Sequence, residues 1–263
     1  MSKRKKINKQ AYQTTAKRIS WTAFLLLVAA LVISAIEQKQ ASTIQTLDIR
    51  IEPLQDSTLL IQQGDVMLSL DRSFGYRFDE RPIRSIDVER IEDVLEREPF
   101  ILDADVYVDA VNVLNIRLKQ RDPILRIIDK NGLHYYLDKD GHKMPLSQHF
   151  TTRTLVASGN IPPHVPDFLD RRRHVLKDLF ALSQRILEDE VLWTMIEQIY
   201  VTNTGDFVFV PMIGDQKIIF GKLDRVEEKI RNLKAFYDRA VPINGWRKYQ
   251  TINLKFKGQI VCS

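Results

Sequence analysis

Histidine and cysteine are the side chains best suited to acid–base, nucleophilic or metal chemistry, and this sequence has few of them. It contains one cysteine, Cys262, and five histidines, which are not spaced as metal ligands: His134, His142, His149, His164 and His174. The local patterns of serine hydrolases, zinc proteases, phosphate loops, dinucleotide-binding turns and dithiol redox centres are also absent from the sequence. We therefore expect no catalytic residue, no metal ligand and no cofactor.

The segment Asp138–His142, DKDGH, resembles a cation-binding loop. An EF-hand calcium loop needs glycine at its sixth position, whereas glycine is fourth here. A hairpin turn explains the same residues, because Asp140-Gly141 supplies the positive φ that a tight turn needs. The turn is the preferred interpretation.

Two other features have open alternatives. The basic run Arg171–His174 is either a docking patch for an acidic partner or anionic lipid, or the solvated start of a helix, since Asp167 and Asp170 dilute its charge. Cys262 leaves the chain without an internal disulfide. A small side chain on a strand is its preferred interpretation, and a reactive thiol or intermolecular bridge is the alternative.

The excess of positive charge is concentrated at the N-terminus. Residues 1–20 hold seven basic side chains and no acid, while the other 243 residues carry 32 basic and 34 acidic groups. A nucleic-acid-binding protein has its basic residues along the folded surface, so this distribution argues against one. No small-molecule substrate is indicated either.

An uncharged run of eighteen residues, Ile19–Ile36, follows the basic tail. As a helix it is about 27 Å long, close to the roughly 30 Å hydrocarbon core of a bilayer. The run is longer than the apolar part of a signal peptide and has a poor cleavage site, so a membrane anchor is preferred over a cleaved signal. The basic tail predicts a cytoplasmic N-terminus, with everything beyond residue 36 outside. The residues expected to meet lipid include Ile19, Trp21, Phe24, Leu26, Leu31 and Ile36.

After a linker at residues 37–46, the pattern predicts strand, helix, helix, strand, strand. Leu47, Ile49 and Ile51 alternate with charged residues, and two helical stretches follow at 62–74 and 85–100. A turn at residues 110–112 would fold 101–120 into a hairpin with one apolar face. On the other face, Asp105 would oppose Arg117 and Asp103 would oppose Lys119, which fixes the register.

A second pattern begins after Pro123. It predicts short strands joined by turns at Asn131-Gly132 and Asp140-Gly141, and further strands at 154–159, 196–202, 206–212 and 217–221. Amphipathic helices are expected at 167–189, with Phe168, Val175, Leu179, Leu182 and Ile186 inward, and at 224–240. We expect an antiparallel sheet with two helices on one side.

The last strand is expected to run from Tyr249 to Val261. Ile252, Leu254, Phe256 and Ile260 alternate with polar residues, which predicts a half-buried edge strand. An open edge can take a partner's segment as a further strand. Lys255 and Lys257 would then discourage self-association or meet the partner's acids. Phe256 is either an anchor or a core residue. The candidate partner-binding residues are Trp246, Tyr249, Thr251, Asn253, Lys255, Phe256, Lys257 and Gln259.

The strand–helix–helix–strand–strand order after a single anchor resembles a POTRA docking domain. Four stretches sharpen the resemblance to the FtsQ/DivIB family of bacterial cell-division proteins. They are QRDPILRI at 120–127, YYLDKDGHKMPLS at 135–147, IIFG at 218–221 and GWRKYQTINLKFKGQIVC at 245–262. The resemblance covers nearly the whole chain.

The resemblance implies an α+β fold with a basic cytoplasmic tail (1–18), a transmembrane helix (19–36), a linker (37–46), a POTRA domain (47–122) and an antiparallel β-domain (123–263). It also implies a non-enzymatic divisome scaffold in the cytoplasmic (inner) membrane at the septum. Its partners would be small FtsB/DivIC-like and FtsL-like division proteins, with FtsB meeting the last strand.

Two other classes of function compete with the division scaffold. A cell-wall hydrolase or transglycosylase needs an activated carboxylate or nucleophile in a cleft, and the sequence suggests none. An outer-membrane assembly factor usually has several POTRA repeats or a barrel, and one repeat is found here. Another envelope docking protein, or an accessory to a cell-wall enzyme, stays the alternative to the division scaffold.

Overall fold

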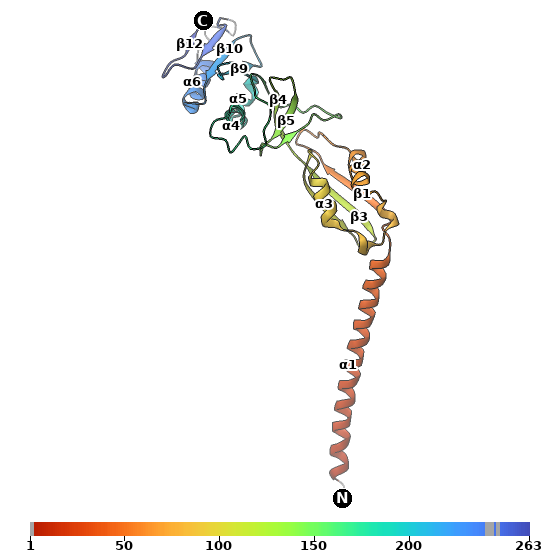
Figure 1. Ribbon diagram of the computed structural model, residues 1–263. Coiled ribbons are helices and arrows are strands. Elements are labelled where there is room, and N and C mark those ends of the chain that lie inside the picture. The colour runs from red at the N-terminus through yellow and green to blue at the C-terminus, as the bar shows by residue number, and fades with distance from the viewer. Residues whose placement is uncertain (1–2, 240–244, 246–247) are drawn as a thin grey trace. The chain divides into compact units, whose positions relative to one another are not determined.

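The computed structural model describes residues 3–239, 245 and 248–263, and their side chains except at 3–17 and 40 (Figure 1). The predicted α+β class is confirmed. The chain forms two compact units, which are described separately. The first comprises Met1–Arg50, Gln63–Leu95 and Ala104–Leu118, and the second comprises Ile51–Gln62, Glu96–Asp103 and Lys119–Ser263.

The first unit begins with a long helix, α1 (Lys3–Ala41), drawn in red to orange in Figure 1. Its segment Arg18–Lys39 has a mean hydropathy of 2.4 and none of it is buried, so it is long and apolar enough to cross a membrane. The six side chains predicted to face lipid are all exposed, from 51% at Ile36 to 72% at Leu26: Ile19, Trp21, Phe24, Leu26, Leu31 and Ile36.

The predicted βααββ order follows α1. It consists of β1 (Thr46–Glu52), α2 (Gln63–Phe74), α3 (Val88–Glu96), β2 (Ile101–Val108) and β3 (Val113–Gln120), with two 3₁₀ turns, η1 (Phe78–Glu80) and η2 (Ile83–Ser85), between the helices. The sheet order is β1–β3–β2, so β1 is an edge strand. The helices bury Val66 and Leu70 of α2 and Ile91 and Leu95 of α3, as their apolar spacing predicts.

The faces of the β2–β3 hairpin are confirmed. The buried side chains are Ala104, Val106, Leu114, Ile116 and Leu118, and the exposed ones are Asp103, Asp105, Arg117 and Lys119. The Asp109 amide donates to the Val113 carbonyl at 3.0 Å, which fits the predicted register. The guanidinium of Arg117 lies 5.1 Å from the ring centroid of Tyr107 on its own face. The opposite-charge pairs stay a prediction.

The second unit contains a nine-stranded sheet in the order β12–β11–β10–β9–β8–β7–β4–β5–β6. Its strands are β4 (Pro123–Ile128), β5 (His134–Asp138), β6 (Lys143–Met144), β7 (Leu155–Gly159), β8 (Ile196–Val201), β9 (Phe207–Pro211), β10 (Lys217–Gly221), β11 (Thr251–Asn253) and β12 (Val261–Cys262). The predicted turns hold Gly132 and Gly141 at φ values of 79° and 85°.

The expectation of an antiparallel sheet needs correction, because the sheet is mixed. β7 pairs in parallel with both β4 and β8, and β10 pairs in parallel with β11. The parallel strands β10 and β11 are joined by a crossover connection that contains α6 (Val226–Arg239). The connection returns the chain to the end of the sheet at which β10 began.

Helices α4 (Val175–Leu187) and α6 pack on one side of this sheet, as expected. Leu179 and Ile186 of α4 and Leu233 of α6 are fully buried in one cluster with alternate strand residues such as Phe209 and Phe220. A further short helix, α5 (Glu190–Met195), was not predicted.

The predicted start of α4 at residue 167 was too early. The His174 ring nitrogen accepts a hydrogen bond from the Leu176 amide at 3.2 Å, so His174 caps the helix and α4 begins at Val175. Phe168 lies before the helix but is buried, as predicted.

The single strand predicted from Tyr249 to Val261 is wrong. The chain forms two short strands, β11 and β12, joined by a loop at Leu254–Ile260. The Asn253 side chain accepts a hydrogen bond from the Lys255 amide, and Gly258 has a φ of 71°. These two features turn the backbone out of the extended conformation, so period-2 alternation does not extend to Phe256, which is 47% exposed.

Candidate protein interface

Among the described residues the large sheet has two edge strands, β6 and β12, and β12 forms the edge at the C-terminal end of the chain. Thr251 and Ser263 exchange both main-chain hydrogen bonds, at 3.1 and 3.2 Å. Hydrogen-bonded and non-bonded pairs alternate in an antiparallel ladder, so the neighbouring Ile252–Cys262 pair is a non-bonded one. The amide and carbonyl of Cys262 therefore point away from β11, toward the open side of the sheet.

The loop between β11 and β12 is attached to the start of α6. The Arg225 guanidinium donates to the Lys255 carbonyl at 2.9 Å, and Glu228 Oε1 accepts from the Gly258 amide at 2.8 Å. Arg225 has a φ of 47°, an uncommon left-handed conformation for a non-glycine residue. Both ends of the exposed stretch Lys255–Gly258 are thus positioned by neighbouring residues.

Lys255 also makes an ion pair within the chain. Its ammonium lies 2.9 Å from Asp206 Oδ2, and Lys222 lies 3.5 Å from the other oxygen of that carboxylate. The hydrogen bond from Lys255 lowers the pKa of Asp206 below its usual range, although partial burial opposes the shift. Lys255 therefore has an acidic partner in its own chain.

Exposed apolar side chains lie beside the β12 edge. Phe256 is 47% exposed and Val261 is 42% exposed. The side chains of Lys257 and Gln259 are also exposed. The cysteine side chain turns the other way: Cys262 packs against the core, and burial raises the pKa of its thiol.

The face of the sheet opposite the helices carries a row of side chains that leads to this edge. The strand registers align Tyr200, Val208, Ile219, Asn253 and Val261 across β8 to β12. Tyr200 is 44% exposed, and Val208 and Ile219 are half-buried. The sequence did not predict this row, because the order of strands in a sheet depends on contacts between distant segments. The alternation of buried and half-buried residues within each strand was the sequence feature that could have indicated it.

The predicted partner-binding residues that the structure describes divide into three groups. Thr251 and Asn253 lie on β11 with half-buried side chains, and the residues of the exposed loop are Lys255, Phe256, Lys257 and Gln259. Tyr249 is half-buried, with its ring centroid 5.8 Å from that of Phe236 on α6. Trp246 lies outside the described residues.

The DKDGH segment forms the predicted hairpin turn. Asp138 is buried, and one of its oxygens accepts from the amides of Asp140 and His142 at 2.9 and 2.8 Å. Its other oxygen pairs with Arg121 at 3.0 Å. Asp138, Asp140 and His142 are close enough to hold a cation. A cation bound there would have to compete with the Arg121 guanidinium for Asp138, the buried one of the two carboxylates.

The basic run at 171–174 is partly used within the fold. Arg171 pairs with Asp167 at 3.0 Å, and His174 caps α4. Burial lowers the pKa of His174, which favours the neutral ring that a capping acceptor needs. One residue of the proposed docking patch is therefore structural.

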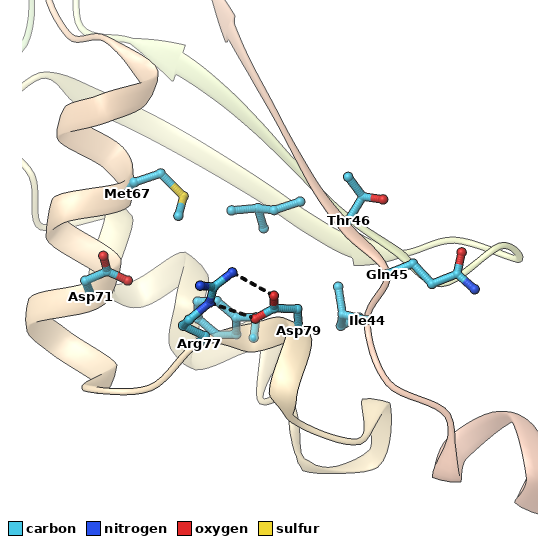
Figure 2. Close-up of a pocket in the computed structure, with 9 residues that line it drawn as sticks. Ile44, Gln45, Thr46, Met67, Asp71, Arg77 and Asp79 are labelled. Carbon is cyan, nitrogen blue, oxygen red and sulfur yellow. Dashed lines mark hydrogen bonds and ion pairs between the residues drawn. The ribbon is translucent and has the colours of Figure 1, made fainter.

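A groove of about 500 Å³ lies in the first unit beside the edge strand β1 (Figure 2). Its walls include Ile44, two residues before β1, Thr46 at the start of β1 and Met67 on α2. Figure 2 shows Arg77 and Asp79 joined by two hydrogen bonds, which are 3.2 and 2.9 Å long. The guanidinium and the carboxylate therefore neutralise each other's charge.

Comparison with known proteins places this architecture in a family. Residues 122–263 match the family described as FtsQ/DivIB, C-terminal related. The chain is also 26% identical over 183 residues to "Cell division protein FtsQ" of Rhodothermus marinus, which covers 67% of this chain and 65% of that protein. The chain thus spans somewhat less than two thirds of the length of the curated relative. The family match takes in more than half of the chain, including every strand of the large sheet, and the chain belongs to the FtsQ/DivIB family.

Proposed function

We propose that the chain is a non-enzymatic assembly scaffold of the bacterial division machinery. In this role it is anchored in the cytoplasmic membrane at the septum by α1 and binds small FtsB/DivIC-like and FtsL-like membrane proteins. Membership of the FtsQ/DivIB family and the cell-division name of the Rhodothermus marinus relative support the role.

The observation that carries the proposal is the open edge of β12. The amide and carbonyl of Cys262 face outward, so an extended segment of a partner can pair with them as a further strand. Main-chain hydrogen bonds then supply affinity. Exposed Phe256 and Val261 are the apolar side chains nearest to such a strand along the chain, and aromatic residues are enriched among interface anchors.

Charge adds selectivity to this edge. Lys255 is paired with Asp206, whereas Lys257 is exposed and makes no ion pair with any residue that the structure describes. We propose that Lys257 meets an acidic residue of the FtsB-like partner, and that both lysines discourage pairing with a second copy of the chain.

The proposal also includes the orientation of the chain in the membrane. Seven basic residues precede the apolar segment and favour a cytoplasmic N-terminus, which leaves both folded units outside the cytoplasm. The partners are expected to be membrane proteins with segments on the same side.

The test is co-purification of the full-length chain, solubilised from dividing cells, with the cell's own FtsB-like and FtsL-like proteins. Co-purification that is lost when Gly258–Ser263 is deleted, while the chain stays folded, supports the proposal. Recovery of neither protein with the intact chain would overturn it. Digestion of peptidoglycan by the purified chain in a zymogram would contradict the non-enzymatic role.

A further inference from the structure

The end of the membrane-spanning helix is bonded to the first folded unit at two places. The Lys39 ammonium donates to the carbonyls of Asp109 and Ala110 in the β2–β3 turn, at 3.4 and 3.3 Å. The Ile83 amide of η2 donates to the Ser42 carbonyl at 2.9 Å, and Thr43 forms a bridge with Pro82. The linker is therefore not a free tether in this structure.

The β2–β3 turn is closely held against that helix end. The Asn112 side chain donates to the Ser42 hydroxyl at 3.1 Å, and the Gln45 amide donates to the Asn112 carbonyl at 2.9 Å. Asp109 Oδ1 accepts from the amides of Val111 and Val113, both at 2.9 Å, which closes the turn. Val111 at its tip is 66% exposed.

The length of the apolar helix indicates where these contacts lie relative to the bilayer. Arg18–Lys39 contains 22 residues, which at 1.5 Å per residue span about 33 Å, close to the roughly 30 Å hydrocarbon core. The headgroup layer on each side adds roughly 5 to 7 Å. Lys39 therefore lies at the boundary of the core, and Ser42, three residues further, lies about 4.5 Å beyond it. A turn bonded to Lys39 and Ser42 is at headgroup level.

We propose that the first unit rests on the bilayer through the β2–β3 turn and η2, with Val111 inserted among the lipid headgroups. The occupant of this surface is the membrane that α1 itself spans, because the surface is continuous with the end of that helix. Arg84 in η2 is exposed, so its guanidinium is free of the core to meet a lipid phosphate, while Lys39 holds the turn at the interface. The contact fixes the orientation of this unit on the membrane.

The inference rests on α1 spanning the bilayer and is independent of the partner proposed above. The test uses the full-length chain with Cys262→Ser, which removes the only natural thiol. Val111→Cys is labelled with an environment-sensitive fluorophore, and the protein is placed in phosphatidylcholine–phosphatidylglycerol vesicles containing a headgroup-attached nitroxide quencher. Resistance to alkaline extraction reports separately that α1 is inserted.

The matched control is Asp105→Cys, an exposed position four residues before Asp109 and roughly 14 Å away along β2. The label at 111 should shift its emission to the blue and be quenched, whereas the label at 105 should behave as in water. Replacing Lys39 with methionine keeps an apolar stem but removes the donor, and should reduce quenching at 111. Equal quenching at 111 and 105 in an extraction-resistant protein would overturn the inference, and unchanged quenching at 111 in the Lys39→Met variant would overturn the role given to Lys39.

Discussion

The ammonium of Lys255 lies 2.9 Å from the Asp206 carboxylate, so the first lysine of the C-terminal loop pairs with the β8–β9 side of its own sheet. The Asp206 side chain is 15% exposed and that of Lys255 is 48% exposed. Together with the contacts from Arg225 and Glu228, this pair holds the loop that leads into the open edge strand. The geometry of the candidate interface thus depends on residues outside it.

This ion pair predicts a pH dependence. The pKa of Asp206 is lowered in the folded state by its hydrogen bond from Lys255. The pair therefore stabilises the fold above the unfolded pKa of about 3.9, and this stability is lost as pH falls through the lower folded pKa. Unfolding followed by circular dichroism between pH 2 and 6 should show a smaller loss of stability on acidification in Asp206→Asn than in the natural chain. Identical pH profiles would contradict the pairing; the other acids with lowered pKa values act equally in both proteins.

The two faces of the β2–β3 hairpin predict a large and a small effect of substitution on stability. Ile116 is fully buried and Asp105 is exposed. Ile116→Asp buries a charge without a partner and should lower the free energy of unfolding by about 3 kcal/mol or more. Asp105→Ala should change it by about 1 kcal/mol or less. Equal shifts in thermal midpoint would contradict this assignment of the two faces.

Membrane topology is predicted by the charge bias around the apolar helix. A reporter enzyme that folds only outside the cytoplasm, fused after Ser263, should be active in cells. Fused after residue 18, before the span, the same reporter should be inactive. Activity of the second fusion alone would reverse the proposed orientation.

The sequence predicted local features well where short-range pattern and charge agreed. The β2–β3 hairpin was predicted because its apolar and charged residues fall into one register, and the turns at Gly132 and Gly141 because Asn-Gly and Asp-Gly have a strong conformational preference. The parallel pairings of β7 and of β11 were missed because they join segments far apart in the chain.

The C-terminal segment lies at an edge of the sheet, as predicted, but it does not form one continuous strand. Alternation suggested one long strand, whereas the Asn253 side chain and Gly258 break it into two. The internal partner of Lys255 could not be predicted, because Asp206 is 49 residues away. Phe256, which the alternation alone assigns neither to the core nor to the surface, is exposed.

The central claim is that a partner strand pairs with the main chain of Cys262, and proline substitution tests it directly. Cys262→Pro removes the outward amide, which no bond of the described fold uses, while Cys262→Ser removes the same thiol but keeps the amide. Proline at Lys255 would be a poorer test, since that amide donates to Asn253.

The measurement is the dissociation constant of each full-length variant for the purified FtsB-like partner, with near-ultraviolet circular dichroism as the check of folding. The account predicts that Cys262→Pro binds about tenfold more weakly than Cys262→Ser, since a lost hydrogen bond of about 1 kcal/mol and the blocked edge act together. Equal affinities in two folded variants would contradict strand addition at this edge.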